Sequence, residues 1–308
     1  MLAIVYAPDS SNSLQLGPVP EPEPADDELV MAVRATSLNF GEVTFMAERQ
    51  QAGHVAGNDA AGVVLRAAAD GSGPPIGTRV AGFSPAGAWA ERLAVGTSQL
   101  TVLPDSVDLA SAAALPTAAT TALRAVEKLG PILGRRVLVT GASGGVGRFA
   151  VQLAALAGAH VVAAVGRPER GVGLLDLGAA EVVVSLEDLA AVDGVLDNVG
   201  GPLLTRAFGL LQSGGLLLSV GSASLESSTV DFEAQRLRAR GTRIEAFSAG
   251  SHPVDNDLQR LVALLAGGRL DPQIGWRGDW TRILEAIEAL RGRLVAGKAV
   301  LDVSASDC

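Results

Sequence analysis

The sequence predicts an α/β fold in two parts, a β-rich first part and a second part built on a doubly wound parallel sheet. Its 308 residues fit two domains at about 150 residues each. The first 115 residues hold short apolar runs between Gly, Pro and Asp turns, as strands do. Further on, strand-like and helix-like runs alternate, which is typical of parallel β-α units. One strand there enters a glycine turn and then a helix, at residues 137–147.

The first part begins with a strand expected over residues 1–7. Four more strands are expected at Leu29–Ala35, Gly62–Ala67, Arg79–Phe83 and Trp89–Val95. The alanine-rich stretch Ser111–Leu129 then predicts a helix, which Pro116 bends or restarts.

The second part alternates strands with helices. The expected strands are Arg136–Thr140, His160–Val165, Glu181–Val184, Gly194–Asn198, Gly215–Val220 and Thr242–Phe247. The expected helices are Gly145–Ala157, Gly171–Leu177, Leu203–Leu211 and Asp257–Ala266. This order favours a parallel, doubly wound sheet.

The last segments do not extend this alternation. They read as a strand at Pro272–Trp276, a helix at Thr281–Leu290 and a strand at Ala299–Val303. We therefore expect the chain to return to its first part after Gly268. The predicted domains are residues 1–117 with 268–308, and residues 118–267.

Charge and composition exclude several classes of protein. The net charge is −9 and no basic stripe is evident, so a nucleic-acid partner is not expected. No apolar run reaches the roughly 18–20 residues of a membrane span. The first residues lack a basic region followed by a long apolar stretch, so we expect a cytoplasmic protein with no membrane association.

Metal-ligating residues are scarce. The only cysteine is Cys308, and the histidines are His54, His160 and His252. They are scattered and show no HxxxH or HExxH spacing, so no metal site is predicted.

The strongest motif is the glycine turn. The apolar strand 137–140 continues directly into Gly141, Ala142, Ser143, Gly144, Gly145, Val146 and Gly147. Glycines at such a turn allow a tight bend, close approach to a pyrophosphate and close packing of helix on strand. The helix N-terminus adds free N–H groups and partial positive charge. The turn therefore predicts a dinucleotide site, although alanine replaces the first glycine of GxGxxG.

The next strand end indicates which dinucleotide. An NAD-binding protein usually carries Asp or Glu there for the ribose 2′-hydroxyl. This chain has Gly166, Arg167 and Arg170, and a guanidinium suits a 2′-phosphate. We predict NADPH rather than NADH, the alternative being that these are ordinary surface arginines.

Ligands of doubly wound sheets lie outside the carboxyl ends of the strands. Three further strand ends are therefore candidates for cofactor contact. Their residues are Asn198, Val199, Gly200, Gly221, Ser222, Ala223, Phe247 and Ser248.

Several segments together give the chain a resemblance to a known family. They are residues 33–43, the Gly57–Val64 stretch, Gly87–Glu91 with Leu115–Ala122, the glycine turn, residues 196–201 with 214–221, and Gly297–Leu301. In these segments the chain resembles the zinc-independent quinone oxidoreductases of the medium-chain dehydrogenase/reductase superfamily.

The resemblance implies a GroES-like catalytic domain, a Rossmann domain, a cleft between them and a homodimer. It also implies roles for single residues. Asn39 and Thr121 would be catalytic and touch the cofactor, Asn39 also donating to a substrate carbonyl. Phe40, Trp89 and Phe247 would line the substrate, and Lys298 would approach the cofactor. The alternatives are an Asn39 that holds its own turn, a Trp89 in the core and a solvated Lys298.

Differences between this chain and the motifs of related families narrow the range of reactions expected for it. Zinc-dependent relatives carry a Gly-His-Glu motif where this chain has Gly57, Asn58 and Asp59. Without a metal to polarise an alcohol, reduction of an electrophilic acceptor is the easier reaction. Polyketide enoyl reductases keep a tyrosine that residues 39–53 lack, and a lysine where this chain has Ser222.

The sequence thus predicts an NADPH-dependent, zinc-independent reductase of a quinone or an α,β-unsaturated carbonyl. Two alternatives stay open. One is an enone or enoyl-thioester reductase in a biosynthetic pathway, and the other is a non-catalytic NADPH-binding module.

Overall fold

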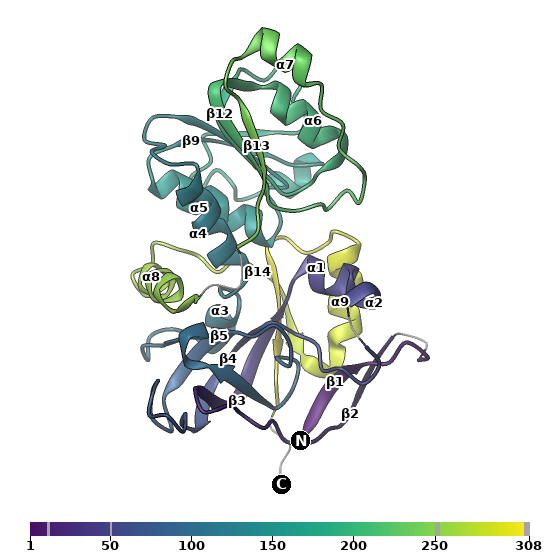
Figure 1. The fold of residues 1–308 in the computed structure, drawn as a ribbon, viewed down its shortest axis with the longest axis vertical. Helices are drawn as coiled ribbons and strands as arrows, with labels where there is room; N and C mark the ends of the chain where they lie inside the picture. Colours follow the sequence, from purple (N-terminus) through teal and green to yellow (C-terminus); the bar gives the residue numbers. More distant parts are fainter. Residues whose placement is uncertain (11–12, 50, 250–252, 305–308) are drawn as a thin grey trace. The chain divides into compact units, whose positions relative to one another are not determined.

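The computed structural model describes residues 1–10, 13–49, 51–249 and 253–304. The chain divides into two units, residues 1–120 with 252–308 and residues 121–251 (Figure 1). The first unit is thus assembled from both ends of the chain, and the second is one continuous segment. His252 and Cys308, which entered the metal argument, lie outside the described residues.

The first unit is organised around a mostly antiparallel sheet in the order β14-β15-β3-β4-β5-β7, with β6 on β3 and a separate β1-β2 hairpin. Its strands are β1 (Leu2–Tyr6), β2 (Leu14–Pro18), β3 (Glu28–Leu38), β4 (Asp59–Arg66), β5 (Arg79–Phe83), β6 (Arg92–Gly96), β7 (Leu100–Val102), β14 (Ile274–Asp279) and β15 (Lys298–Asp302). β15 lies between β14 and β3, so strands far apart in the sequence are neighbours in this sheet.

Short helices surround this sheet. They are α1 (Phe40–Thr44), α2 (Met46–Arg49), η1 (Thr97–Gln99), α3 (Leu109–Ala113), α8 (Asp255–Ala266), η3 (Trp280–Arg282) and α9 (Ile283–Arg291). The core beneath them is apolar and includes Leu29, Met31, Trp89, Trp280 and Leu301. Trp280 and Leu301, from the last part of the chain, thus share one core with residues of β3.

The second unit holds a six-stranded sheet in the order β10-β9-β8-β11-β12-β13, with every neighbouring pair parallel. Its strands are β8 (Arg136–Thr140), β9 (His160–Ala164), β10 (Glu181–Val183), β11 (Val192–Asp197), β12 (Leu211–Ser219) and β13 (Arg243–Ala246). The strand order is that of the Rossmann fold, so the predicted doubly wound parallel sheet is confirmed.

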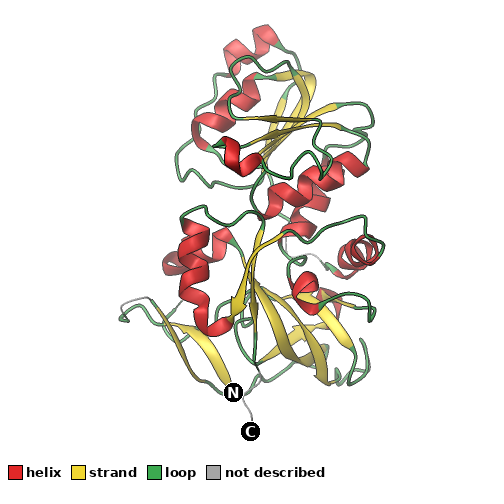
Figure 2. Ribbon diagram, turned by 180° about the vertical axis from the view of Figure 1, so that it is seen from behind, coloured by secondary structure: helices red, strands yellow, loops and turns green. Residues whose placement is uncertain are grey.

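The helices of this unit are α4 (Ala118–Lys128), α5 (Gly145–Leu156), η2 (Pro168–Gly171), α6 (Gly201–Gly209) and α7 (Phe232–Arg238). Helix α5 packs on β8 and β9, and α6 packs on β11 and β12 (Figure 2). The two crossovers run in opposite directions along the sheet and are right-handed, which places α5 and α6 on opposite faces.

Two local features differ from the predictions. The helix expected at Gly171–Leu177 is a series of turns, and Gly173 and Gly178 have positive φ there. The stretch 111–129, by contrast, forms two helices, α3 and α4, so the restart expected at Pro116 is confirmed. Helix α7 was not expected at all.

The domain boundary expected at 267 also differs from the observed division. Helix α8 packs on β7 and η1 of the first unit, and the Val254 N–H donates to the Ser98 carbonyl at 3.1 Å. Residues 253–267 therefore belong with the first unit, because these contacts outweigh the β-α alternation of the sequence.

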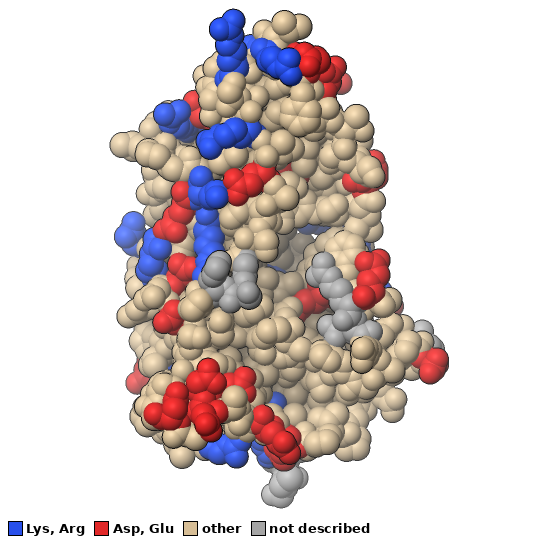
Figure 3. Space-filling model, in the orientation of Figure 1, with Lys and Arg blue, Asp and Glu red and all other residues tan. Residues whose placement is uncertain are grey.

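Charged side chains of both signs lie in scattered groups on the face seen in Figure 3, with most of its arginines and lysines over the second unit. The exposed arginines around α7 and β13 are Arg236, Arg238, Arg240 and Arg243. Acidic residues interrupt this region, since Glu233 pairs with Arg236 at 2.9 Å and Glu245 with Lys128 at 3.0 Å. In the described part of the chain no helix is long and apolar enough to cross a membrane.

Candidate functional site

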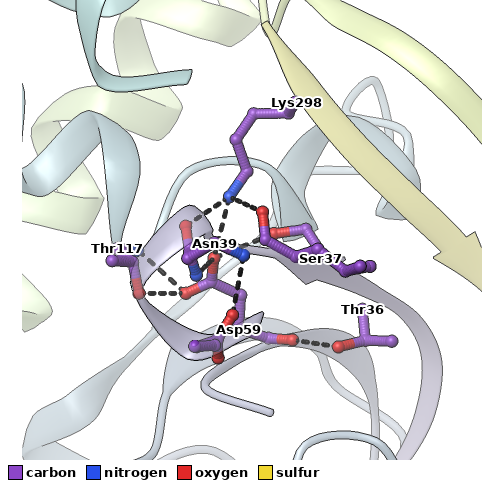
Figure 4. A network of polar contacts seen from close by, with 8 residues as sticks. Thr36, Ser37, Asn39, Asp59, Thr117 and Lys298 are labelled. Atoms are coloured by element: carbon purple, nitrogen blue, oxygen red, sulfur yellow. Dashed lines mark hydrogen bonds and ion pairs between the residues drawn. The ribbon is translucent and has the colours of Figure 1, made fainter. Parts of the chain in front are cut away.

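A buried polar cluster lies in the first unit where β3, β4 and β15 meet (Figure 4). Strand register builds it. Ser37 of β3 is the direct partner of Asp59 on β4, and Leu38 is the partner of Ala299 on β15. Asn39 follows Leu38 as the N-cap of α1, and Lys298 precedes Ala299. Segments far apart in the sequence thus place their polar side chains together.

Asp59 is the acceptor at the centre of the cluster and is 0% exposed. Its Oδ2 accepts from Ser37 Oγ at 2.8 Å and from Asn39 Nδ2 at 2.9 Å. Its Oδ1 accepts from the Thr117 backbone N–H at 2.9 Å and from the Thr117 hydroxyl. Its backbone carbonyl accepts from Thr36 Oγ1 at 2.6 Å. A buried carboxylate needs such partners to offset the loss of water.

Lys298 supplies the matching positive charge and is 2% exposed. Its Nζ donates to the Leu38 carbonyl at 3.0 Å and to Asn39 Oδ1 at 2.6 Å, and it lies 3.3 Å from Asp59 Oδ2. An ammonium group has three N–H donors, and all three are used here. Lys298 is therefore held within this cluster, and its approach to the cofactor stays a prediction.

Glu42 completes the cluster from the first turn of α1. Its Oε2 accepts from the Asn39 backbone N–H at 2.7 Å, while Oε1 is buried with no hydrogen-bond partner among the described residues. Burial raises the pKa of Glu42 to about 8, the nearby Asp59 carboxylate raises it further, and Lys298 opposes the rise. Glu42 is therefore mostly protonated and neutral at pH 7.

The only part of this cluster predicted to do chemistry was Asn39, and its amide is now well defined. Nδ2 faces a carboxylate and Oδ1 faces an ammonium group. If the amide were turned over, Oδ1 would face the Asp59 carboxylate and Nδ2 would face the Lys298 ammonium group. The amide therefore has one favourable orientation. Nδ2 has a second hydrogen, and the Asn39 side chain also interacts with Glu42, where it lowers the pKa of the carboxyl. Phe40, the first residue of α1, is half-buried beside Asn39.

Trp89 does not belong to a substrate site. It is 0% exposed within the core of the first unit, and its backbone pairs with Ile4 and Ala56. A side-chain carbon on Gly57 would lie 2.2 Å from the Trp89 ring. The expected substrate role of Trp89 is therefore corrected, because a fully buried indole has no surface for a ligand.

The second candidate site is the glycine turn between β8 and α5. Gly141 has φ +59°, and Gly144 is the N-cap of α5 with no side-chain cap. A Cβ on Gly147 would lie 2.3 Å from the Gly141 carbonyl oxygen and 2.7 Å from the Ala142 Cα. The turn therefore requires glycine at 147 for packing, and the first N–H groups of α5 have no partner inside the helix.

Neighbouring strand ends meet at this turn through side chains not predicted from the sequence. Asp197, at the end of β11, is 0% exposed. It accepts from the Thr140 hydroxyl and from the Gly200 N–H at 2.8 Å. Asn198 Nδ2 donates to the Thr140 carbonyl at 2.9 Å. Burial raises the pKa of Asp197, and the Thr140 and Gly200 hydrogen bonds oppose the rise.

The remaining strand ends lie at the same edge of the parallel sheet. The Ala223 N–H donates to the Asn198 carbonyl at 3.3 Å, and a Cβ on Gly221 would lie 3.0 Å from that oxygen. Ser222 lies against Gly200, and Val199 against Gly141. The Phe247 N–H donates to the Ser219 carbonyl at 2.9 Å, which carries Phe247 and the exposed Ser248 past the end of β12.

The two predicted arginines follow β9. Arg170 Nε donates to Ser143 Oγ at 2.8 Å, so it lies over the glycine turn. Gly166 and Arg167 are exposed, with Arg167 the N-cap of η2. Thr121 lies at the start of the second unit, half-buried on α4. The structure brings Arg170 to the turn and leaves Arg167 open to solvent.

A pocket of about 540 Å³ opens beside these strand ends. It is lined by the segment after β10, the N-terminus of α6 and the segment after β12, among them Ser185, Gly200, Pro202, Arg206 and Ser224. Arg206 Nη2 donates to the Glu187 carbonyl at 2.8 Å across one side of it. The pocket thus lies at the carboxyl-terminal edge of the parallel sheet.

The site residues that were not predicted differ in how clearly a local sequence pattern marks them. Asn39 and Glu42 have the spacing of a capping box, so their pairing could have been found. Asp197 is an acid at the end of an apolar strand, which is also a recognisable signal. Nothing in the local sequence links Thr117 to Asp59, because that contact depends on the tertiary fold.

Comparison with known proteins gives relatives of two kinds. The zinc-binding dehydrogenase family matches residues 145–267. A mycocerosic acid synthase-like polyketide synthase of Mycobacterium tuberculosis is 32% identical over 241 residues, 73% of this chain and 11% of that protein. An erythronolide synthase of Saccharopolyspora erythraea is 32% identical over 316 residues, 97% of this chain and 8% of that protein. The chain thus spans about a tenth of the length of these curated relatives.

Similar solved structures cover nearly the whole chain. The Escherichia coli quinone oxidoreductase complexed with NADPH has a TM-score of 0.87 at 21% identity, over 98% of this chain and 100% of that one. A thermostable alcohol dehydrogenase from Pyrobaculum aerophilum has a TM-score of 0.86 at 25% identity, over 98% and 99%. Together these matches define the two-domain fold of a dehydrogenase or reductase, GroES-like in the first unit and Rossmann in the second. The fold of the chain is therefore that of the medium-chain dehydrogenase/reductase superfamily, with the family match confined to residues 145–267.

The residues that the structure describes do not fit the zinc that the matching family's name suggests. Within the described ranges no group of three or more His, Cys, Asp or Glu side chains could hold a metal ion. Asn58, at the histidine position of zinc-dependent relatives, uses its amide Nδ2 to donate to the Ser84 and Pro85 carbonyls at 2.8 Å.

Proposed function

We propose that this chain is an NADPH-dependent, zinc-independent reductase that transfers hydride to a quinone or an α,β-unsaturated carbonyl. The observation that carries the proposal is the glycine turn, where β8 enters α5 with a Gly147 that admits no side chain and with Arg170 held over it. The fold relatives support it, since the E. coli quinone oxidoreductase structure is a complex with NADPH.

The second unit supplies the proposed cofactor site. The N–H groups at the start of α5 and the turn 141–147 would hold the pyrophosphate. Arg167 and Arg170 would pair with the 2′-phosphate, because a guanidinium matches phosphate geometry. The strand-end residues Asn198–Gly200, Gly221–Ala223 and Phe247 would border the rest, with Thr121 near the nicotinamide. When bound, the reduced nicotinamide supplies the hydride.

The first unit supplies the proposed substrate contact. The second Nδ2 hydrogen of Asn39 would donate to the acceptor's carbonyl oxygen, and Phe40 would pack beside it. When hydride adds to the β-carbon of a conjugated carbonyl, negative charge gathers on that oxygen. An oriented donor stabilises this charge more than it stabilises the ground state. No metal is needed for an acceptor that is already electrophilic.

The second candidate is reduction of an enoyl thioester, and one observation favours it. The curated relatives include polyketide synthases, one of them 32% identical over 73% of this chain. The absence of a tyrosine in residues 39–53 and the presence of Ser222 speak against it. The chemistry at Asn39 would be the same for both acceptors.

The experiment is anaerobic NADPH oxidation, followed at the absorbance of the reduced nicotinamide, with three acceptors in parallel. These are a polycyclic ortho-quinone, an unsaturated ketone and a crotonyl thioester, each with an NADH control. Turnover with NADPH preference supports the proposal, and the acceptor used assigns the substrate class. NADPH binding without oxidation of any acceptor would favour the non-catalytic module instead.

We also propose that the chain forms a homodimer. β13 is the last strand of the second unit's sheet, so its outer edge pairs with no other strand in the described part of the chain. Open edges of this kind associate readily with another strand. Light scattering on the eluting protein would give twice the 31.2 kDa chain mass for a dimer and one chain mass if the proposal is wrong.

A further inference from the structure

The Asp59–Lys298 ion pair lies directly beneath Asn39. Both charged side chains are almost fully buried, at 0% and 2% exposure, whereas Asn39 is only half-buried. The amide of Asn39 contacts both of them, at 2.9 Å on the nitrogen side and 2.6 Å on the oxygen side. Asn39 therefore contacts both buried charges and is itself partly accessible to solvent.

Such a pair is not explained by stability alone. Removing two charges from water costs about as much as their attraction returns, and apolar replacements are often equally stable. The first unit already has a large apolar core around Trp89 and Trp280. What the pair adds is a fixed direction, because a carboxylate and an ammonium group can be satisfied by one amide orientation only.

The pair also changes the strength of the Asn39 donor. The Lys298 charge on Oδ1 draws electron density from the amide and makes the second Nδ2 hydrogen more positive, and hydrogen bonds in a chain strengthen one another. Glu42 holds the Asn39 backbone N–H at 2.7 Å, so the residue is fixed at its main chain as well. A preorganised donor of this kind does not have to reorient when charge develops on a ligand.

We propose that Lys298 and Asp59 are positioning residues that act through Asn39, orienting and polarising its amide toward the carbonyl oxygen of the acceptor. This inference rests on the proposed reductase function. It assigns Lys298 to the substrate side of the reaction rather than to the cofactor phosphates.

The test is a double-mutant cycle between Lys298→Met and Asn39→Ala. If Lys298 acts through Asn39, Lys298→Met lowers kcat/KM for the acceptor about 10- to 100-fold in the wild-type background, the range of a lost charge-assisted hydrogen bond. In the Asn39→Ala background it lowers kcat/KM less than about twofold, because the amide it orients is gone. The NADPH dissociation constant, measured by fluorescence, changes little in either background.

Two outcomes overturn the proposal. One is a loss from Lys298→Met that is equally large with and without Asn39. The other is an NADPH affinity that falls as much as kcat/KM, which would support the cofactor role of Lys298. Arg277→Met is the matched control. It removes an exposed ion pair with Asp302, which lies on β15 as Lys298 does, and it should leave kcat/KM unchanged.

Two additions keep the test decisive. If Lys298→Met does not fold, the neutral pair Asp59→Asn with Lys298→Met replaces it in the cycle. If none of the three acceptors supports NADPH oxidation by the wild-type protein, the proposed function fails. The orientation of the Asn39 amide is then measured by NMR instead. The Asn39 side-chain amide, assigned by its loss in Asn39→Ala, should exchange slowly in the wild type and faster in Lys298→Met. Equal exchange rates would contradict the positioning role.

Discussion

The two candidate sites are built in opposite ways. In the second unit, one stretch of seven residues provides a turn whose function depends on the absence of side chains, as at Gly147. In the first unit, four separate segments provide side chains that satisfy one another around Asp59. A backbone-built site tolerates no added atoms, whereas a side-chain-built site tolerates no removed partner. The sensitive positions of each should therefore respond to different substitutions.

The largest effect is expected at the centre of the side-chain site. Asp59→Ala leaves the Lys298 charge buried without its partner and removes the acceptor of Ser37, Asn39 and Thr117, so it should cost about 3–5 kcal/mol of unfolding free energy. Urea unfolding measures this loss. Asp302→Ala, which breaks the exposed pair with Arg277, should cost no more than about 1 kcal/mol. Similar losses for the two variants would show that the cluster is not a mutually dependent unit.

The next effect depends on pH. The pKa of Glu42 rises from 4.5 to about 8 in the folded protein, through burial and then through the Asp59 carboxylate, with Lys298 opposing. Between these values the folded chain holds a proton that the unfolded chain has released. Stability from this group is therefore full below pH 4.5 and is lost as the pH rises through about 8.

Glu42→Gln should abolish this pH dependence, because a neutral amide can still accept from the Asn39 N–H. The variant should exceed the wild type in stability at pH 9 by roughly a few kcal/mol. Unfolding series from pH 4 to 9 test this, with the exposed Glu48→Gln as the control. A wild type and a Glu42→Gln variant that lose stability in parallel would exclude Glu42 as the titrating group.

For the backbone-built site, the cofactor arginine gives a third prediction. Arg167→Ala should weaken NADPH binding by about 1.5–3 kcal/mol, the scale of a charged hydrogen bond, and leave NADH binding nearly unchanged. Arg236→Ala removes an equally exposed arginine on α7 and should affect neither cofactor. Binding titrations with both nucleotides decide the matter. An equal loss for NADPH and NADH would rule out a 2′-phosphate contact.

The smallest effect is a single added methyl group. Gly147→Ala places a carbon 2.3 Å from the Gly141 oxygen, so helix and turn must separate, at a cost of about 1–3 kcal/mol. Gly209→Ala is the control, because nothing lies within 4 Å and alanine favours the helix. Thermal unfolding compares the two. A Gly147→Ala variant as stable as the wild type would mean that the turn has room to spare.

The same contrast explains which features of the structure could be predicted from the sequence. The turn at 141–147 is contiguous, and its strand β8 and helix α5 lie where the apolar pattern predicts them. The cluster around Asp59 has no such local pattern, so its members were not predicted to meet. The core position of Trp89 likewise depends on the tertiary fold, and its burial corrects the substrate role given to it. The missed boundary at α8 has the same cause. A helix reads alike from sequence whichever unit it packs on.

The placement of β15 between β14 and β3 has a consequence for how the chain comes off the ribosome. The second unit is complete once residue 251 has emerged and can fold while synthesis continues. The sheet of the first unit lacks the strand between β14 and β3 until residues 298–302 have been synthesised. Until then the Asp59 carboxylate also lacks its contact with Lys298. Strand β15 therefore completes a sheet whose strands β3 to β7 are synthesised well before it.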